Sequence, residues 1–326
     1  MTNSISPSVK QAVNLQLPIH TSPWDHKALS PSYAQGVAYV DDRYVPVGDA
    51  RIPLLDWGFT RSDACQDTIS VWDGQFFRIE DHLDRFERSW KSLRLTNPLS
   101  KDEVRDVVHK LVAIGGWRDA YVQIIMTRGI PPIGSRDPRQ CQNRFQAFAI
   151  PYVWIASPEK QKDGMSVHVS DIRRVPAQSV SPLIKHYHWL DFEMGLFEAL
   201  DCSADTVLLK SMDGFISEGP GFNVFAVVDG KLVTPKTAAL DGMTRRTVLE
   251  LSSEIGIEAE EINLDLDSLI AAEEAFLTTT AGGILPVTVV NGRKIGNGPG
   301  ALTAKLHREY WDRRTSGWLG SPALYW

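Results

Sequence analysis

Apolar runs broken by short polar turns predict several β-hairpins along the chain. The segments ISVWDGQFFRI and NVFAVVDGKLVTP each place an Asp-Gly pair between two strand-like runs. Asp-Gly and Asn-Gly pairs favour the positive φ angles of a type I′ turn, which joins antiparallel strands tightly. Such pairs lie between strand-like runs at Asp73-Gly74, Asp213-Gly214, Asp229-Gly230 and Asn291-Gly292. We therefore expect substantial antiparallel sheet, which argues against a doubly wound parallel fold.

Four other segments have the apolar spacing of amphipathic helices. Ser100 and Glu103 form a capping-box pair just before an apolar stripe over 104–112. A second stripe consists of Trp189, Phe192, Leu196, Phe197 and Leu200. A third helix is predicted over 244–255, closed by Gly256, and a fourth over 302–311. Helices mixed with hairpins indicate the α+β class.

The length of 326 residues predicts roughly two domains of about 150 residues each. The segment AIPYVWIASP at 149–158 contains two prolines and is the best candidate for a connection between domains. We place an N-terminal arm and a small α/β domain at 1–150, the connection at 151–158 and a larger domain at 159–326.

Composition excludes several classes of protein. The chain has 34 Lys and Arg against 40 Asp and Glu, and a net charge of −6 is the wrong sign for binding nucleic acid. The longest apolar run, near 147–156, has about ten residues, whereas a membrane span needs about 20. The N-terminal residues lack the pattern of a signal peptide, and three scattered cysteines form no disulfide framework. We expect a cytoplasmic protein that binds neither nucleic acid nor membrane.

Lys185 is the first candidate for chemistry, because it lies in the apolar and aromatic segment SPLIKHYHW. Desolvation lowers the pKa of an amine and makes it a nucleophile for an aldehyde. A lysine at a strand end with its stem on apolar surface has the same pattern, so the segment alone leaves both interpretations open. His186 and His188 could bind a metal, but a third ligand at suitable spacing is lacking, so no metal is expected.

Three further segments offer groups that could bind a charged aromatic cofactor. Glu218 precedes the turn Gly219-Pro220-Gly221, and a carboxylate there could hold a protonated pyridine nitrogen. Thr244 begins a predicted helix, whose N-terminus suits a phosphate, although Thr244 could equally be a simple helix cap. Thr279 and Thr280 add hydroxyl groups before a glycine pair, where threonines are more often structural.

Taken in order, these segments resemble the fold type IV aminotransferases that use pyridoxal 5′-phosphate (PLP). This family includes branched-chain and D-amino acid aminotransferases, and the likeness is greatest to the (R)-selective amine transaminases. In that subgroup a lysine precedes a Trp-x-Asp step, as Lys185 precedes Trp189–Asp191. The family segments EGxGFN, GxTRxxV and TTAGG are matched at Glu218–Asn223, Gly242–Val248 and Thr279–Gly283. The likeness runs from about residue 35 to the end.

The resemblance implies a smaller N-terminal α/β domain, a larger C-terminal domain and a homodimer. It implies that PLP forms a Schiff base with Lys185, which then acts as base and acid in a ping-pong transamination. In VWDGQFFRIEDHLDRF it assigns the cofactor phosphate to Arg85, whose fork of N–H groups suits a dianion. The other residues implied to bind the cofactor are Glu218, Asn223, Met243, Thr244, Thr279 and Thr280.

The substrate is less clearly indicated, because Gln66 stands where (R)-amine transaminases usually have a tyrosine. Arg61 or Arg136 could bind a substrate carboxylate, or both could be ordinary surface residues. The expected substrate pocket consists of Arg61, Gln66, Tyr121, Gln123, Arg136, Trp189 and Ala281. We expect amino transfer from an (R)-amine or D-amino acid to a 2-keto acid or ketone. The alternatives are a branched-chain L-amino acid aminotransferase, a PLP lyase of the aminodeoxychorismate type and a non-enzymatic or metal-binding protein on the same scaffold.

Overall fold

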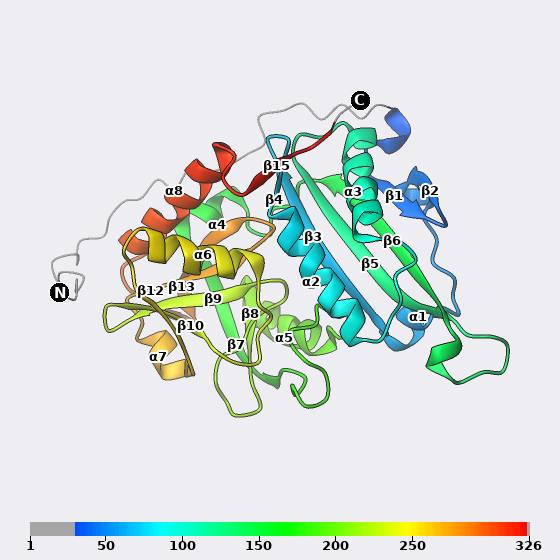
Figure 1. Cartoon of the computed structure of the whole chain (residues 1–326). Coiled ribbons are helices and arrows are strands. Elements are labelled where there is room, and N and C mark those ends of the chain that lie inside the picture. Colours follow the sequence, from blue (N-terminus) through cyan, green and yellow to red (C-terminus); the bar gives the residue numbers. More distant parts are fainter. Residues whose placement is uncertain (1–29, 325–326) are drawn as a thin grey trace. The chain divides into compact units, whose positions relative to one another are not determined.

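The computed structural model of the chain describes residues 30–324, which form two compact units (Figure 1). The N-terminal unit comprises 30–153, Ile184–His188 and 314–324, and the C-terminal unit comprises Trp154–Leu183 and Trp189–Arg313. The N-terminal arm expected from the sequence lies almost wholly outside the described residues. None of the helices within 30–324 is long and apolar enough to cross a bilayer.

The N-terminal unit is built on a seven-stranded sheet in the order β15-β4-β3-β5-β6-β1-β2. Each of its pairings is antiparallel. The strands are β1 (Val37–Val40), β2 (Arg43–Pro46), β3 (Ala64–Trp72), β4 (Gln75–Phe77), β5 (Ala120–Ile130), β6 (Gln142–Pro151) and β15 (Gly320–Pro322).

Helices cover one face of this sheet, with α2 on β3 and α3 across β1, β5 and β6 (Figure 1). The helices of the unit are η1 (Pro31–Tyr33), η2 (Val47–Asp49), α1 (Trp57–Arg61), α2 (Ile79–Ser92), α3 (Lys101–Gly115) and η3 (Pro138–Gln140). The predicted capping box is confirmed: Ser100 Oγ accepts from Glu103 N, and the Glu103 carboxylate accepts from Ser100 N at 2.8 Å. Apolar side chains of the strands and of both long helices form one core beneath them.

The C-terminal unit contains a mixed sheet in the order β11-β10-β9-β12-β13-β7-β8, with β14 paired to β13. Its strands are β7 (Met165–Arg173), β8 (Thr206–Lys210), β9 (Asn223–Val228), β10 (Lys231–Pro235), β11 (Ala259–Ile262), β12 (Glu274–Thr279), β13 (Gly283–Val290) and β14 (Arg293–Lys294). Its helices are α4 (Pro158–Asp163), α5 (Leu190–Asp201), α6 (Met243–Glu254), α7 (Leu266–Ile270) and α8 (Ala301–Thr315). Two sheets with several helices confirm the predicted α+β class.

Three of the four predicted hairpins are present. The pairs at 73–74, 229–230 and 291–292 have both residues at positive φ and join β3 to β4, β9 to β10 and β13 to β14. At Asp213-Gly214 the chain also reverses with antiparallel backbone bonds, from Ser211 N to Phe215 O and from Ser217 N to Leu209 O, but the returning segment is not a regular strand, so the fourth hairpin is incomplete. A further hairpin joins β1 to β2 through Asp41-Asp42, with φ angles of 49° and 57°.

In helix α5, the residues that face the sheet differ from the apolar stripe that the sequence predicted. Phe192 is buried as expected, but Phe197 and Leu200 are 62% and 57% exposed. The small residues face the sheet instead, and a Cβ added to Gly195 would come within 2.7 Å of Leu209 Cδ2 on β8. Close packing on small residues therefore leaves large apolar side chains outside.

Candidate functional site

The segment around Lys185 is fixed by its backbone against the N-terminal sheet. Lys185 N donates to Ser89 Oγ on α2 at 3.3 Å, and Gln66 N on β3 donates to Lys185 O at 2.8 Å. His186 forms an antiparallel bridge with Cys65, and Ile184 packs against the core of this unit. The lysine predicted to carry the cofactor is thus held by β3 and α2, far from it in sequence.

Arg85 belongs to a buried charged cluster with Asp67 and His82. Arg85 donates from Nε and Nη2 to the two oxygens of Asp67, at 2.8 and 2.7 Å. His82 Nδ1 donates to Asp67 Oδ1 at 2.8 Å, because a carboxylate without a proton can only accept. The three residues are at most 3% exposed. Sequence reasoning found Arg85 and missed the other two, although His82 precedes Arg85 by three positions, on the same face of a helix.

The electrostatics of this cluster favour one charge state. Burial alone would raise the pKa of Asp67, but the guanidinium of Arg85 and the bond from His82 bring it well below its usual value. Burial lowers the pKa of His82 from its ordinary 6.5, and the charge of Lys185 lowers it further, against the opposing effect of Asp67. The cluster therefore consists of an ionised carboxylate, a guanidinium and a neutral imidazole at neutral pH.

The opposite face of the same strands carries the polar residues predicted to meet the substrate. Gln66 and Thr68 on β3 lie beside Tyr121 and Gln123 on β5, because Thr68 pairs with Gln123 in the antiparallel register. Thr68 Oγ1 donates to Gln66 Oε1 at 3.1 Å and lies 3.5 Å from the Tyr121 hydroxyl. Burial raises the pKa of Tyr121, so this phenol stays protonated. The structure brings these predicted pocket residues onto one surface.

The two candidate arginines come from α1 and from a loop, not from the strands of that polar surface. Arg61 ends α1 and stacks its guanidinium on Trp57, 3.4 Å from the ring centroid. Arg136 lies in the loop between β5 and β6. Both side chains are exposed.

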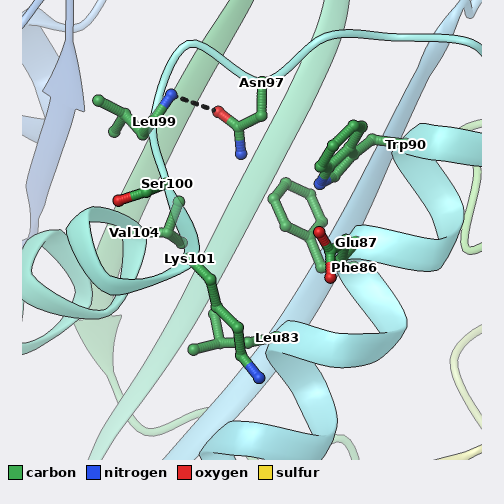
Figure 2. A pocket seen from close by; sticks show the side chains of 9 residues that line it. All are labelled: Leu83, Phe86, Glu87, Trp90, Asn97, Leu99, Ser100, Lys101 and Val104. Atoms are coloured by element: carbon green, nitrogen blue, oxygen red, sulfur yellow. Dashed lines mark hydrogen bonds between the residues drawn. The ribbon is translucent and has the colours of Figure 1, made fainter.

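A small cavity lies between α2 and the start of α3. Figure 2 shows the side chains around this space of about 180 Å³, which come from α2, α3 and their connection. The lining residues are Leu83, Phe86, Glu87, Trp90, Asn97, Leu99, Ser100, Lys101 and Val104. No residue of the predicted site lines it, since His82, Arg85 and Ser89 recur at helical spacing on another face of α2.

In the C-terminal unit, Glu218 is buried and held by two partners. Arg174 Nη2 donates to Glu218 Oε1 at 3.2 Å, and Leu240 N donates to Oε2 at 2.9 Å. Arg174 also pairs with Asp191 and lies over the ring of Phe192, 4.0 Å from its centroid. Sequence reasoning missed Arg174, which contacts two carboxylates at once.

The loop before α6 packs closely against Asn223 and leads into the N-terminus of that helix. Asn223 Nδ2 donates to Leu240 O at 2.9 Å, and a Cβ on Gly242 would meet Asn223 Oδ1 at 2.1 Å. No side chain in the described part of the chain caps α6, and Met243 and Thr244 are buried at its first turn. The backbone N–H groups of this turn and the helix dipole suit a phosphate, so the residues present fit a phosphorylated cofactor.

Most of the remaining predicted residues of this unit, Thr279, Thr280 and Ala281, lie at the end of β12 or directly after it. Thr279 Oγ1 donates to Gly221 O at 3.0 Å and accepts from Ala281 N at 3.2 Å. Trp189 packs edge-on to Phe192, with ring centroids 5.6 Å apart. Thr280 is half-buried in the turn that follows the strand. Among residues 30–324, no group of three His, Cys, Asp or Glu side chains is placed to hold a metal ion.

Comparison with known proteins identifies the family. A family model described as amino-transferase class IV matches residues 64–290. The chain belongs to the class IV aminotransferases. This class IV aminotransferase is 30% identical to a branched-chain-amino-acid aminotransferase of Pseudomonas aeruginosa over 87% of its own length and 94% of that protein. It is 28% identical to a D-alanine aminotransferase of Bacillus licheniformis over 81% of its length and 92% of that protein.

Solved structures agree with this assignment. A branched-chain aminotransferase of Thermoproteus uzoniensis, solved with norvaline, matches with a TM-score of 0.81 and 28% identity. The match covers 88% of the class IV aminotransferase described here and 99% of that chain. A branched-chain amino acid aminotransferase of Thermobaculum terrenum, solved in its PLP form, shares the fold with a TM-score of 0.79.

Proposed function

We propose that this class IV aminotransferase moves an amino group from an (R)-amine or D-amino acid to a 2-keto acid or ketone by a ping-pong mechanism. The Trp-x-Asp step after Lys185, shared with (R)-selective amine transaminases, supports this assignment. Its aspartate, Asp191, accepts from Arg174, which also donates to Glu218. Asp191, which marks the subgroup in sequence, therefore shares its partner Arg174 with Glu218, the residue proposed to bind the ring nitrogen of the cofactor.

The cofactor is PLP, which supplies an electrophilic aldehyde and an electron-withdrawing ring when bound. Lys185 would hold the cofactor through its aldehyde group, and its free Nζ amine would take the proton from the donor Cα and serve as the acid that returns it. Arg85 and the first turn of α6, with Met243 and Thr244, bind the phosphate. Glu218 binds the protonated ring nitrogen. Asn223, Thr279 and Thr280 complete the cofactor-binding residues.

The substrate-facing residues in this proposal are Gln66, Tyr121, Gln123, Trp189 and Ala281. The side chains of Gln66, Thr68 and Tyr121 are linked by hydrogen bonds and make a polar surface that suits a polar substrate. Arg61 or Arg136 binds the carboxylate of an amino acid donor. Relatives named as branched-chain-amino-acid aminotransferase and aminodeoxychorismate lyase keep those two reactions as alternatives.

The proposed oligomer is a homodimer. Helix α5 supports self-association, because four of its large apolar side chains remain exposed. They are Leu190, Met194, Phe197 and Leu200. Contiguous apolar side chains of this size commonly mark a protein interface.

A single-turnover half-reaction tests the proposed substrate class. The PLP form of the enzyme is mixed in separate experiments with (R)-1-phenylethylamine, D-alanine and L-leucine, and the cofactor absorbance is followed. We expect rapid conversion by the (R)-amine or by D-alanine. Conversion by D-alanine alone indicates that an arginine binds the carboxylate. Conversion by L-leucine alone would contradict the proposal and favour the branched-chain alternative. Pyruvate formed from aminodeoxychorismate without a keto acid would favour the lyase.

A further inference from the structure

Asp67 is the centre of the buried cluster that contains Arg85. Its Oδ1 accepts from Thr68 N, His82 Nδ1 and Arg85 Nη2 at 2.8, 2.8 and 2.7 Å, and its Oδ2 accepts from Arg85 Nε at 2.8 Å. Asp67 is 0% exposed, on a strand that is buried along its whole length. The carboxylate is therefore held in place by the backbone N–H of Thr68 and by His82, in addition to its bonds with Arg85.

The bond pattern between Asp67 and Arg85 fixes the guanidinium in space. A guanidinium has five N–H donors in one plane, and Asp67 engages one on Nε and one on Nη2. Two parallel bonds define both the position and the plane of the group, whereas one bond would let it rotate. The donors beyond this pair, on Nη1 and the second on Nη2, then point in directions set by Asp67.

We propose that Asp67 is a positioning residue that orients Arg85 to bind the cofactor phosphate. This inference rests on the proposed role of Arg85. Asp67 itself does not touch the cofactor. It holds the fork of N–H groups in the orientation that a phosphate requires, so the arginine need not be ordered when the cofactor binds.

Because Arg85 and Asp67 carry opposite charges, the orientation of the Arg85 guanidinium can be distinguished from its electrostatic attraction for a phosphate. Asp67 cancels much of the positive charge of Arg85 at close range, so a phosphate gains mainly from directed hydrogen bonds. A lysine at position 85 would keep the charge but could not form the paired bonds to Asp67. Asp67→Asn would instead place an amide N–H group against a guanidinium that only donates, which breaks one of the two bonds.

The test compares cofactor binding by the full chain after removal of PLP. Dissociation constants for PLP and for pyridoxal, which lacks the phosphate, are measured by absorbance titration. The variants are Arg85→Ala, Asp67→Asn, the double variant and Arg85→Lys. Asp63→Asn is the matched control, since Asp63 holds Arg128 through the same paired geometry, at 2.8 and 3.0 Å, in the same unit. Circular dichroism is used to check that each variant folds.

We expect Asp67→Asn to weaken PLP binding by about tenfold to a hundredfold, the range for a charge-assisted hydrogen bond. Pyridoxal binding should stay unchanged, Asp63→Asn should bind PLP like the wild type, and the double variant should bind it no more weakly than Arg85→Ala. A loss in Arg85→Ala without a loss in Asp67→Asn would overturn the positioning role and leave Arg85 in place. Unchanged PLP binding by Arg85→Ala would overturn the proposed phosphate site as well.

Arg85→Lys keeps the inference testable if Asp67→Asn does not fold. We expect this variant to lose nearly as much PLP affinity as Arg85→Ala, because its charge is retained but its orientation by Asp67 is lost. PLP binding by Arg85→Lys equal to that of the wild type would overturn the inference.

Discussion

Two of the charged residues predicted to bind the cofactor, Arg85 and Glu218, are each held by a buried partner of opposite charge. Arg85 is paired with Asp67, and Glu218 is paired with Arg174. Removing one member of a buried pair is strongly destabilising, because the other is left without a compensating charge. The motifs identify Arg85 and Glu218 from the sequence. Their partners lie 18 and 44 positions away along the chain, so only the folded sheets bring them together.

Arg174→Ala should be among the most destabilising single changes in the C-terminal unit. It removes the shared partner of the buried carboxylate of Glu218 and the partly buried carboxylate of Asp191. We expect a loss of about 3–5 kcal/mol in the free energy of unfolding, measured by urea denaturation. Arg173→Ala, at the neighbouring half-buried position, is the control and should change stability by less than about 1 kcal/mol. Equal effects of the two substitutions would show that Arg174 is not the centre of a buried charge network.

At the scale of elements, local signals in the sequence predicted turns and helix starts well. The capping box of α3 and three hairpins depend on residues within a few positions of one another, so the local pattern determines them. The hairpin at Asp41-Asp42 was missed because aspartate takes the left-handed conformation less often than glycine. The parallel pairings of β7 with β8 and β13 could not be predicted, because they depend on long connections.

In the candidate site too, local motifs could be predicted from the sequence and tertiary packing could not. The segment order Lys185, Glu218, Thr244, Thr279 was enough to indicate a family and a cofactor. The orientation of α5 was not predictable, since an apolar stripe does not show whether large or small residues face the sheet. Gly195 and Ala199 are buried there, while Phe197 and Leu200 remain outside.

At the scale of the whole molecule, the segment Ile184–His188 departs from the order of the chain. It belongs to the N-terminal unit, although the residues on either side of it belong to the C-terminal unit. Its contact from Lys185 to Ser89 spans 96 positions. Sequence reasoning placed Lys185 within a continuous larger domain, because nothing local in SPLIKHYHW shows which sheet it joins.

The exposed face of α5 gives a test of the proposed homodimer. We expect light scattering to give twice the chain mass for the wild type at micromolar concentration and the monomer mass for Phe197→Glu, because a charge at an apolar contact is costly to bury. Lys305→Glu, at an exposed position of α8 in the same unit, should remain dimeric. A monomeric wild type would refute the homodimer, and a dimeric Phe197→Glu would place its interface elsewhere.

Covalent binding of PLP by Lys185 can be tested by borohydride reduction followed by peptide mass spectrometry. Reduction converts a Schiff base into a stable phosphopyridoxyl-lysine. We expect the label on the peptide that contains Lys185, and no label on Lys185→Ala, whose folding is checked by circular dichroism. A label on a different lysine, or no label on the wild type at saturating PLP, would show that Lys185 does not bind the cofactor covalently.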